Sequence, residues 1–486
     1  MFGYLVLAAF GLASCARGEQ TEIDEATVHD PRQRSGGAGA GGGSETGGAS
    51  GNSGEGGMAP QKPICQKLPS EARVLAGLEN PKDVFDGYTP LSITAGGSII
   101  FNTNPPYNAS GPFRNVYSVS IFGGAAKLLS SSKAAPQGAL LPGAIGDVVS
   151  YTAILDAETG AEWPWLQHVE KSFDISPVDF IASKMGVGIG QLKFGPSSLG
   201  MGGPTHYRMA VSVSVIGKKA EETGRDIILL DILDQGDHFK VQGTERITVP
   251  NGHAYNPALS PDGVFMAYWR TSYPEETVEK NSFPKKPGTF ELILRNIETG
   301  DEKVVESSLQ PERLEEGMRY IQRISVSNEG DVVYGVQVSN ADEGPNTHVH
   351  LYHADAGKIE DVGAGETPSM SGNGALMAYE KLKGKKWEEL ESSIVIRRVK
   401  TGLETFVVGP NLLGRCDLIP LLDAKAQGLA WYHSETGDYQ VVGMMLPDVD
   451  DDGIPDIADN CPYIPSQDLT DADGDGVGKP CDPDEQ

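Results

Sequence analysis

Near its carboxyl end the chain carries aspartates with the spacing of a loop that binds a hard cation. If Asp448 is position 1 of a twelve-residue loop, carboxylates fall at positions 3, 5, 9 and 12, and Gly453 occupies position 6, where a sharp turn is needed. The carbonyl at position 7 can supply a further oxygen. The candidate ligands of this segment, called loop one below, are Asp448, Asp450, Asp452, Asp456, Asp459 and the carbonyl of Ile454. Because Ca²⁺ prefers oxygen ligands in this arrangement, the spacing predicts a calcium site.

The same spacing recurs in a second segment, called loop two, with Gly476 at the turn position. Its candidate ligands are Asp471, Asp473, Asp475, Asp482 and the carbonyl of Val477. Lys479 stands where loop one has Asp456, so we expect loop two to lack one carboxylate. The alternative interpretation is a disordered acidic tail. Two glycines kept in register with two sets of aspartates argue against that alternative.

The whole run resembles a thrombospondin type 3 repeat, because an Asp-Asn-Cys-Pro sequence from Asp459 to Pro462 separates the two loops and Cys481 closes the second. The resemblance implies a small, irregular calcium-binding module over residues 447–486. It also implies a disulfide between Cys461 and Cys481. An EF-hand would need helices around each loop, and the prolines of this segment disfavour them.

Charge is concentrated in this module. The chain has 67 acidic and 39 basic residues and a formal net charge of −28. Without a cation, the aspartate-rich tail should repel itself and stay extended, whereas calcium should allow it to close. The sequence has no basic patch that would indicate a nucleic-acid partner.

The amino-terminal residues predict export and a lipid anchor. An apolar run too short to span a bilayer precedes Leu12-Ala13-Ser14-Cys15, which resembles a bacterial lipobox. The resemblance implies removal of a signal peptide over residues 1–14 and lipid attachment to Cys15. Ala16 after the cysteine implies the outer membrane, at its periplasmic face or the cell surface. No positive residue precedes the apolar run, so an uncleaved or lipid-free segment is the alternative.

Residues 15–64 are expected to form a flexible tether, because their Gly/Ser-rich stretch cannot bury enough apolar surface to order the backbone. With Cys15 lipidated and the module disulfide formed, Cys65 and Cys416 remain, near the two ends of the central region. We expect them to form a disulfide in an oxidising compartment, with two free thiols as the alternative.

The central region, residues 65–446, repeats a short β-rich run that follows a glycine turn. The period of about 45–60 residues predicts an all-β fold, a six- to seven-bladed β-propeller. The run Ser260-Pro261-Asp262-Gly263 resembles the propeller repeats of the Tol translocation protein; Ser325 and Ser369 begin degenerate copies. The last repeat lacks a strand, which residues 71–76 are expected to complete.

Two further groups of residues could bind a ligand. Trp163 and Trp165 flank a proline in what we expect to be a loop, where they could stack on a glycan or anchor a protein. Packing between blades is the alternative. His348, His350 and His353 could ligate a metal, but no partner motif accompanies them, so we expect ordinary strand histidines.

These features favour a calcium-binding, lipid-anchored envelope protein whose propeller is a binding or adhesion scaffold for a protein or glycan. No nucleophile-elbow motif is present, so we do not expect an enzyme. The alternative is a propeller hydrolase or lyase that acts on extracellular polysaccharide or peptide. It would need carboxylates or histidines that converge on the inner strands.

Overall fold

A computed structural model describes residues 65–483 with gaps. The gaps are 78–91, 95–96, 104–114, 130–136, 157–160, Ser172, 216–224, Asn251, 273–288, 308–320, 338–346, 385–388, 413–415, 435–439, Gly453, Ala458, 467–469 and 474–476. The expected signal peptide, Cys15 and nearly all of the expected tether therefore lie outside the described residues.

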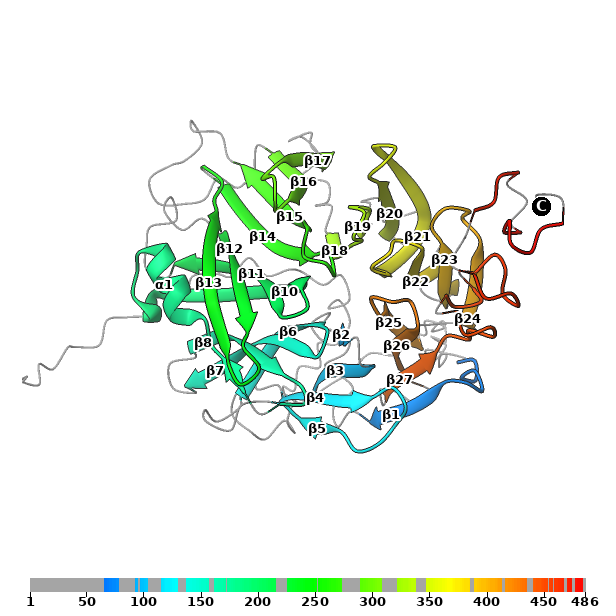
Figure 1. The fold of residues 1–486 in the computed structure, drawn as a ribbon, viewed down its shortest axis with the longest axis horizontal. Helices are drawn as coiled ribbons and strands as arrows, with labels where there is room; N and C mark the ends of the chain where they lie inside the picture. Colours follow the sequence, from blue (N-terminus) through cyan, green and yellow to red (C-terminus); the bar gives the residue numbers. More distant parts are fainter. Residues whose placement is uncertain are drawn as a thin grey trace, which may run out of the picture. The chain divides into compact units, whose positions relative to one another are not determined.

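Antiparallel β-sheets account for nearly all regular structure in the described residues (Figure 1). The first three sheets each have four strands in sequence order. They contain β2 (Ser92–Ile93), β3 (Ser98–Thr103), β4 (Asn115–Ser120) and β5 (Lys127–Leu128); β6 (Gln137–Ile145), β7 (Val148–Asp156), β8 (Ala161–His168) and β9 (Asp174–Ile175); and β10 (Leu192–Gly203), β11 (His206–Val215), β12 (Asp226–Asp234) and β13 (Phe239–Ile247).

The following sheets continue the pattern, and one long strand is shared. The fourth sheet contains β14 (Gly252–Leu259), β15 (Phe265–Ser272), β16 (Thr289–Asn296) and β17 (Glu302–Ser307). The seven-stranded sheet contains β18 (Ile321–Val326), β19 (Val332–Gln337), β20 (Thr347–His353), β21 (Lys358–Met370), β22 (Leu376–Lys383), β23 (Glu391–Arg398) and β24 (Glu404–Leu412). The first half of β21 pairs with β20 and its second half with β22, so this sheet is two four-stranded units joined by one strand.

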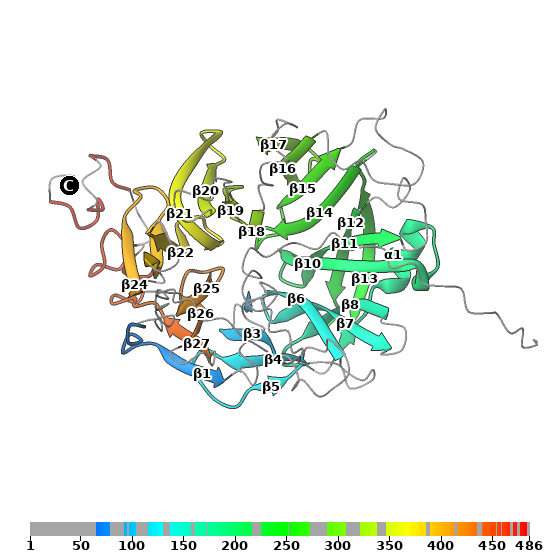
Figure 2. The same ribbon diagram turned by 180° about the vertical axis from the view of Figure 1, so that it is seen from behind.

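The last sheet joins the two ends of the central region. It contains β25 (Asp417–Leu422), β26 (Gly428–His433), β27 (Gln440–Met445) and the amino-terminal strand β1 (Arg73–Gly77), which pairs antiparallel with β27 (Figure 2). This confirms that residues 71–76 supply the missing strand. The disulfide Cys65–Cys416 is present beside this closure and fixes the segment before β1 to the start of β25.

Buried apolar residues lie between successive sheets. Among the described residues they form seven clusters, each shared by two neighbouring four-stranded units, such as Ile100 with Tyr151, Trp269 with Tyr334, and Ile99 with Tyr432. The last of these pairs joins the first sheet to the last one. A run of sheets that pack face to face and return to the first is a β-propeller, which confirms the expected all-β propeller fold.

The Ser-Pro-Asp-Gly turn is built from side-chain hydrogen bonds. The Ser260 hydroxyl donates to Asp262 Oδ1 at 2.6 Å and accepts from the Phe265 amide at 2.9 Å. Ser371 repeats this with Asn373 and Leu376, and Ser327 accepts from the Asp331 amide. The degenerate copies therefore begin at Ser327 and Ser371, two residues later than we expected.

Ser325 and Ser369 instead form hydrogen bonds between neighbouring units. The Met370 amide donates to Ser325 Oγ at 3.1 Å, and the Leu422 amide donates to Ser369 Oγ at 3.1 Å. Ser198 does the same for the Leu259 amide at 2.9 Å. Because these bonds join innermost strands, they fix adjacent sheets to one another.

A short helix, α1 (Val178–Met185), precedes β10 and contacts β13; a 3₁₀ turn, η3 (Ile189–Gln191), follows it. The buried residues of α1 recur at the helical period, so one face of α1 packs on the sheet; they are Val178, Ile181, Ala182 and Met185. Within the described part of the chain, no helix has the length and apolar character required to cross a membrane.

Candidate metal centre

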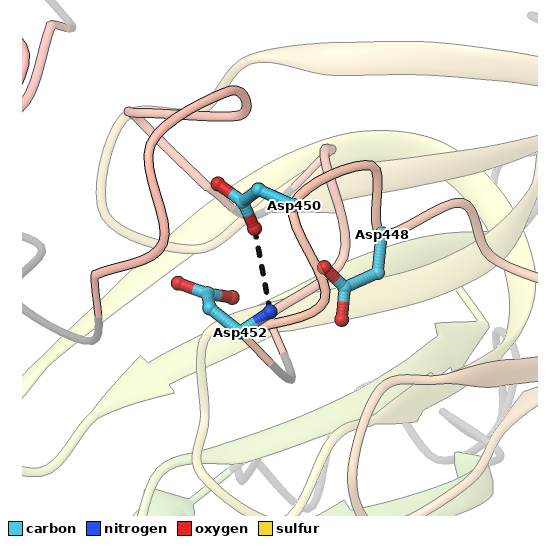
Figure 3. Close-up of side chains that lie close together, drawn as sticks. All are labelled: Asp448, Asp450 and Asp452. Atoms are coloured by element: carbon cyan, nitrogen blue, oxygen red, sulfur yellow. Dashed lines mark hydrogen bonds between the residues drawn. The ribbon is translucent and has the colours of Figure 1, made fainter.

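Loop one begins directly after β27, where the buried Leu446 leads into an irregular segment. Asp448, Asp450 and Asp452 point toward one another, and one carboxylate oxygen from each lies within 4.8 Å of the others (Figure 3). All three side chains are half-buried. Among the described residues this is the one group of three or more potential metal ligands, and it consists of residues that the sequence predicted.

Backbone amides hold these carboxylates in place. The Asp452 amide donates to Asp450 Oδ1 at 3.3 Å, and the Ile454 amide donates to Asp452 Oδ1 at 2.8 Å. Across the loop, the Val449 amide donates to Asp456 Oδ1 at 2.8 Å. Each of these bonds uses one carboxylate oxygen, and together they shape the turn.

Asp459, at position 12, is the most deeply buried of the predicted ligands in loop one, with 1% of its surface exposed. Its Oδ1 accepts from the Cys461 amide at 2.7 Å, while its buried Oδ2 has no hydrogen-bond partner. Burial raises the pKa of Asp459, and the negative charges of Asp452 and Asp450 raise it further against the Cys461 hydrogen bond. The group of three carboxylates within 4.8 Å of one another does not include Asp456 or Asp459, but the buried Oδ2 of Asp459 lacks a donor.

Loss of hydration also raises the pKa of Asp450, as do the charges of Asp452 and Asp448. Like charges held this close destabilise the ionised state unless a cation neutralises them. The donors are all oxygens, with no thiolate or imidazole in the group. A hard cation such as Ca²⁺ or Mg²⁺ fits this donor set, whereas structural zinc sites favour sulfur and nitrogen ligands.

Loop two is described only in part, because Asp475 lies outside the described residues. Asp482 is buried, whereas Asp471 is half-buried and Asp473 and Val477 are exposed. No metal-ligand cluster forms among its described residues. Its calcium site stays a prediction.

Loop two folds back on loop one. The disulfide Cys461–Cys481 is present, with Cα atoms 5.6 Å apart. The Gly478 amide donates to the Asn460 carbonyl at 3.0 Å, and a Cβ atom at Gly478 would lie 2.4 Å from Asn460 Oδ1. A side chain at position 478 would therefore displace the Asn460 side chain.

Arg398, at the end of β23, is a neighbour of loop one that sequence reasoning missed. Its guanidinium donates to the carbonyls of Asp456, Ile457 and Asp459. Burial lowers the pKa of Arg398, and the Asp459 charge opposes this shift. Nothing in the sequence pattern signals the contact, because about sixty positions separate the partners and no motif joins them.

The other candidate residues are placed differently from the prediction. Trp163 and Trp165 lie in strand β8 instead of a loop, and both are half-buried against apolar clusters. Pro164 lies within the strand, opposite Thr152 of β7, and β9 pairs only with residues further along β8. A ligand role for the two tryptophans stays a prediction.

The three histidines of β20 each lie beside a carboxylate. His348 Nδ1 is 3.0 Å from Asp361, His350 Nδ1 is 3.1 Å from Glu306, and His353 Nε2 is 3.2 Å from Glu360. None of them joins a metal-ligand group in the described part of the structure. These contacts agree with the reading as ordinary strand histidines.

No protein-family model matches the chain, and no curated protein matches it. Among solved structures, it is similar to TolB from Acinetobacter baumannii at 12% identity, over 71% of this chain and 63% of that one, with a TM-score of 0.35. The chain thus spans less than two thirds of that protein's length.

Two other similar structures illustrate the range of propeller proteins. Oligogalacturonate lyase from Vibrio parahaemolyticus is 11% identical, over 80% of this chain and 93% of that one, with a TM-score of 0.40. The β-propeller domain of the Trilobed protease from Pyrococcus furiosus is 7% identical, over 74% and 95%, with a TM-score of 0.44. Strand order and packing of the sheets define the β-propeller fold, and no activity follows from these likenesses.

Proposed function

We propose that this protein is a calcium-binding, lipid-anchored envelope protein whose β-propeller serves as a binding scaffold without enzymatic activity. Loop one of a thrombospondin type 3-like module, residues 447–486, is the calcium site. The observation that carries the proposal is the convergence of Asp448, Asp450 and Asp452, together with a buried oxygen of Asp459 in the same loop that has no hydrogen-bond partner.

We infer seven blades for the propeller. The shared strand β21 divides the seven-stranded sheet into two four-stranded units, and these together with the five other sheets make seven. A closed propeller presents loops from every blade on a rigid frame, which suits recognition of a protein or glycan at the outer membrane. Anchoring through Cys15 and the tether would hold that frame at the membrane while leaving it free to reorient.

Extracellular calcium modules bind calcium with dissociation constants of roughly 10⁻⁴–10⁻³ M. Loop one would therefore be occupied in a calcium-rich medium and emptied by a chelator. The site thereby makes the scaffold conditional on its environment. Isolation of partners from envelope extracts, with and without chelator, would identify a ligand whose capture depends on calcium.

The calcium assignment is tested by titrating the oxidised protein with calcium in a calorimeter. Asp452→Ala removes a central oxygen donor and should weaken loop one at least tenfold. The matched control is Asp237→Ala, which removes an exposed carboxylate of the β12–β13 turn and should leave the affinity unchanged. Absence of calcium heat at millimolar concentration in the wild-type protein would refute the assignment.

A further inference from the structure

The second half of loop one contacts the propeller, because residues of the blades bind its backbone. Arg398 reaches from the end of β23 and donates from Nη2 to the Asp456 carbonyl at 3.3 Å and the Asp459 carbonyl at 2.9 Å. Its Nε donates to the carbonyl between them, that of Ile457. One guanidinium therefore fixes the backbone that carries positions 9, 10 and 12 of the loop.

The hydrogen-bond acceptors of Arg398 are unusual for an arginine that lies beside several carboxylates. Bidentate pairing with a carboxylate is the geometry that arginine favours. Arg398 makes no ion pair among the described residues, and its donors go to carbonyls. The carboxylates of Asp456 and Asp459, which each accept one backbone amide at Oδ1, are thus not paired with this guanidinium, while the backbone that orients them is clamped.

An apolar contact reinforces the clamp. Ile457 packs against the buried cluster that joins β22 and β23 to β26 and β27, which includes Leu376 and Trp431. Leu68, from the segment that precedes β1, packs on the same cluster. The calcium loop therefore contacts the seam where the carboxyl-terminal blades and the ring-closing segment meet.

A second feature indicates that a ligand belongs in this clamped loop. The Asp459 side chain is 1% exposed, and its Oδ2 has no hydrogen-bond partner. Buried acceptors without a donor are rare in folded proteins and are satisfied by an ion or water. The same residue supplies the carbonyl that Arg398 holds and the carboxylate that lacks a partner.

We propose that loop one and the propeller form one cooperative unit, in which Arg398 is the positioning residue for the calcium site. This rests on the calcium-binding function proposed above. Calcium bound in loop one stabilises the propeller seam through Arg398 and Ile457. By thermodynamic linkage the effect is reciprocal. Calcium favours the seam contacts by some factor, and loss of these contacts weakens calcium binding by the same factor.

Arg398 acts on the site in two opposite ways. Its positive charge repels a bound divalent cation, whereas its hydrogen bonds keep Asp456 and Asp459 in a binding geometry. Arg398→Lys retains the charge and loses the three-way contact, and Arg398→Met loses both. If positioning dominates, both variants bind calcium at least tenfold more weakly; if repulsion dominates, Arg398→Met binds more tightly than wild type.

The test combines calorimetric titration of calcium with thermal unfolding of the full protein, each in calcium and in chelator. We expect calcium to raise the unfolding temperature of the wild-type propeller by a few degrees. Asp450→Asn should abolish this shift, and Asp473→Asn, in loop two, should retain most of it. Both Arg398 variants should reduce calcium affinity and shrink the shift.

The matched control is Arg397→Met, one residue away on the same strand. Arg397 pairs with Glu360 and Glu404, and because side chains alternate along a strand it projects from the opposite face to Arg398. This variant should lower the unfolding temperature in chelator while calcium affinity stays within about twofold of wild type. A merely structural role for Arg398 would give that same pattern, whereas a positioning role lowers calcium affinity.

The outcomes separate this inference from the function on which it rests. If the wild-type protein binds no calcium, the proposed function itself is wrong. If calcium binds through Asp450 but the Arg398 variants bind it as wild type does, the positioning role is wrong and the function stands. If the propeller unfolded at the same temperature in calcium and in chelator, the proposal of one cooperative unit would be wrong.

Discussion

His253, near the start of β14, is a single residue through which acid should destabilise the fold. Its Nδ1 accepts from the Arg225 amide at 2.9 Å, a bond that only the neutral ring can make. Burial, with the positive charge of Arg225, lowers the pKa of His253 to about 4. The unfolded ring keeps a pKa near 6.5, so the unfolded state takes up the proton first as the pH falls.

His253 therefore contributes stability that is complete above pH ~6.5 and is lost as the pH falls toward ~4. The loss should reach about 2 kcal/mol near pH 5. Urea unfolding at pH 7.5 and pH 5 measures it. His253→Asn keeps an acceptor for the Arg225 amide and should remove this part of the pH dependence; an unchanged slope in the variant would contradict the account.

Asp417 is a second residue with a large expected effect on stability, because its carboxylate joins β24, β25 and β26. It is 1% exposed, and its carboxylate accepts from Trp431 Nε1 at 2.8 Å, His433 Nδ1 at 2.7 Å and Asn411 Nδ2 at 2.9 Å. Asp417→Ala strands these donors and should cost about 3–5 kcal/mol of unfolding free energy. Asp237→Ala, at an exposed carboxylate, should change it by no more than about 0.5 kcal/mol. Equal effects of the two substitutions in urea unfolding would contradict this role.

At the scale of elements, β1 and the disulfide Cys65–Cys416 hold the ring shut. The two cysteines lie 351 positions apart, so the disulfide restricts the unfolded chain strongly. Replacing both with serine should lower the unfolding free energy of the propeller by about 2–5 kcal/mol. Calorimetry of unfolding in chelator measures this.

The second disulfide provides the comparison. Cys461 and Cys481 lie only 20 positions apart and join loop one to loop two. Their replacement by serine should leave propeller unfolding in chelator nearly unchanged. If both double variants shifted propeller unfolding equally, the Cys65–Cys416 pair would not be the specific restraint on ring closure.

Much of this architecture could be predicted from local patterns. The glycine turns and alternating strands predicted the repeats, and the missing strand of the last repeat predicted the pairing of residues 71–76 with β27. The register of the degenerate turns was harder to predict. Ser325 and Ser369 look like turn residues, but each lies two residues before its turn and forms a hydrogen bond with the next unit. The prediction that Trp163 and Trp165 lie in a loop was wrong, because pairing with β7 extends β8 through Pro164.

The predicted ligands of loop one also show which contacts a sequence can and cannot predict. Asp448, Asp450 and Asp452 are close in sequence, so their spacing alone predicted that they converge. Arg398 could not be predicted, because the contact forms only once β23 lies in its place in the propeller. Long-range contacts of this kind depend on the whole fold and leave no local signal.

At the scale of the whole molecule, the proposal joins an anchor, a scaffold and a calcium site. Cys15→Ser should remove the lipid, so the protein should leave the membrane fraction and appear in the soluble envelope extract. Labelling with a radioactive fatty acid checks the modification directly. Membrane retention and labelling in the variant equal to wild type would contradict lipid attachment at Cys15.

Calcium in loop one is the claim on which the conditional scaffold depends, and a crystal structure grown with calcium tests it most directly. The account predicts anomalous density between Asp448, Asp450 and Asp452, with carboxylate oxygens about 2.3–2.6 Å from the ion. Asp459 should contribute its buried oxygen to the same ion, and Arg398 should still hold the carbonyls. Ordered aspartates in loop one with no ion between them, at millimolar calcium, would contradict it.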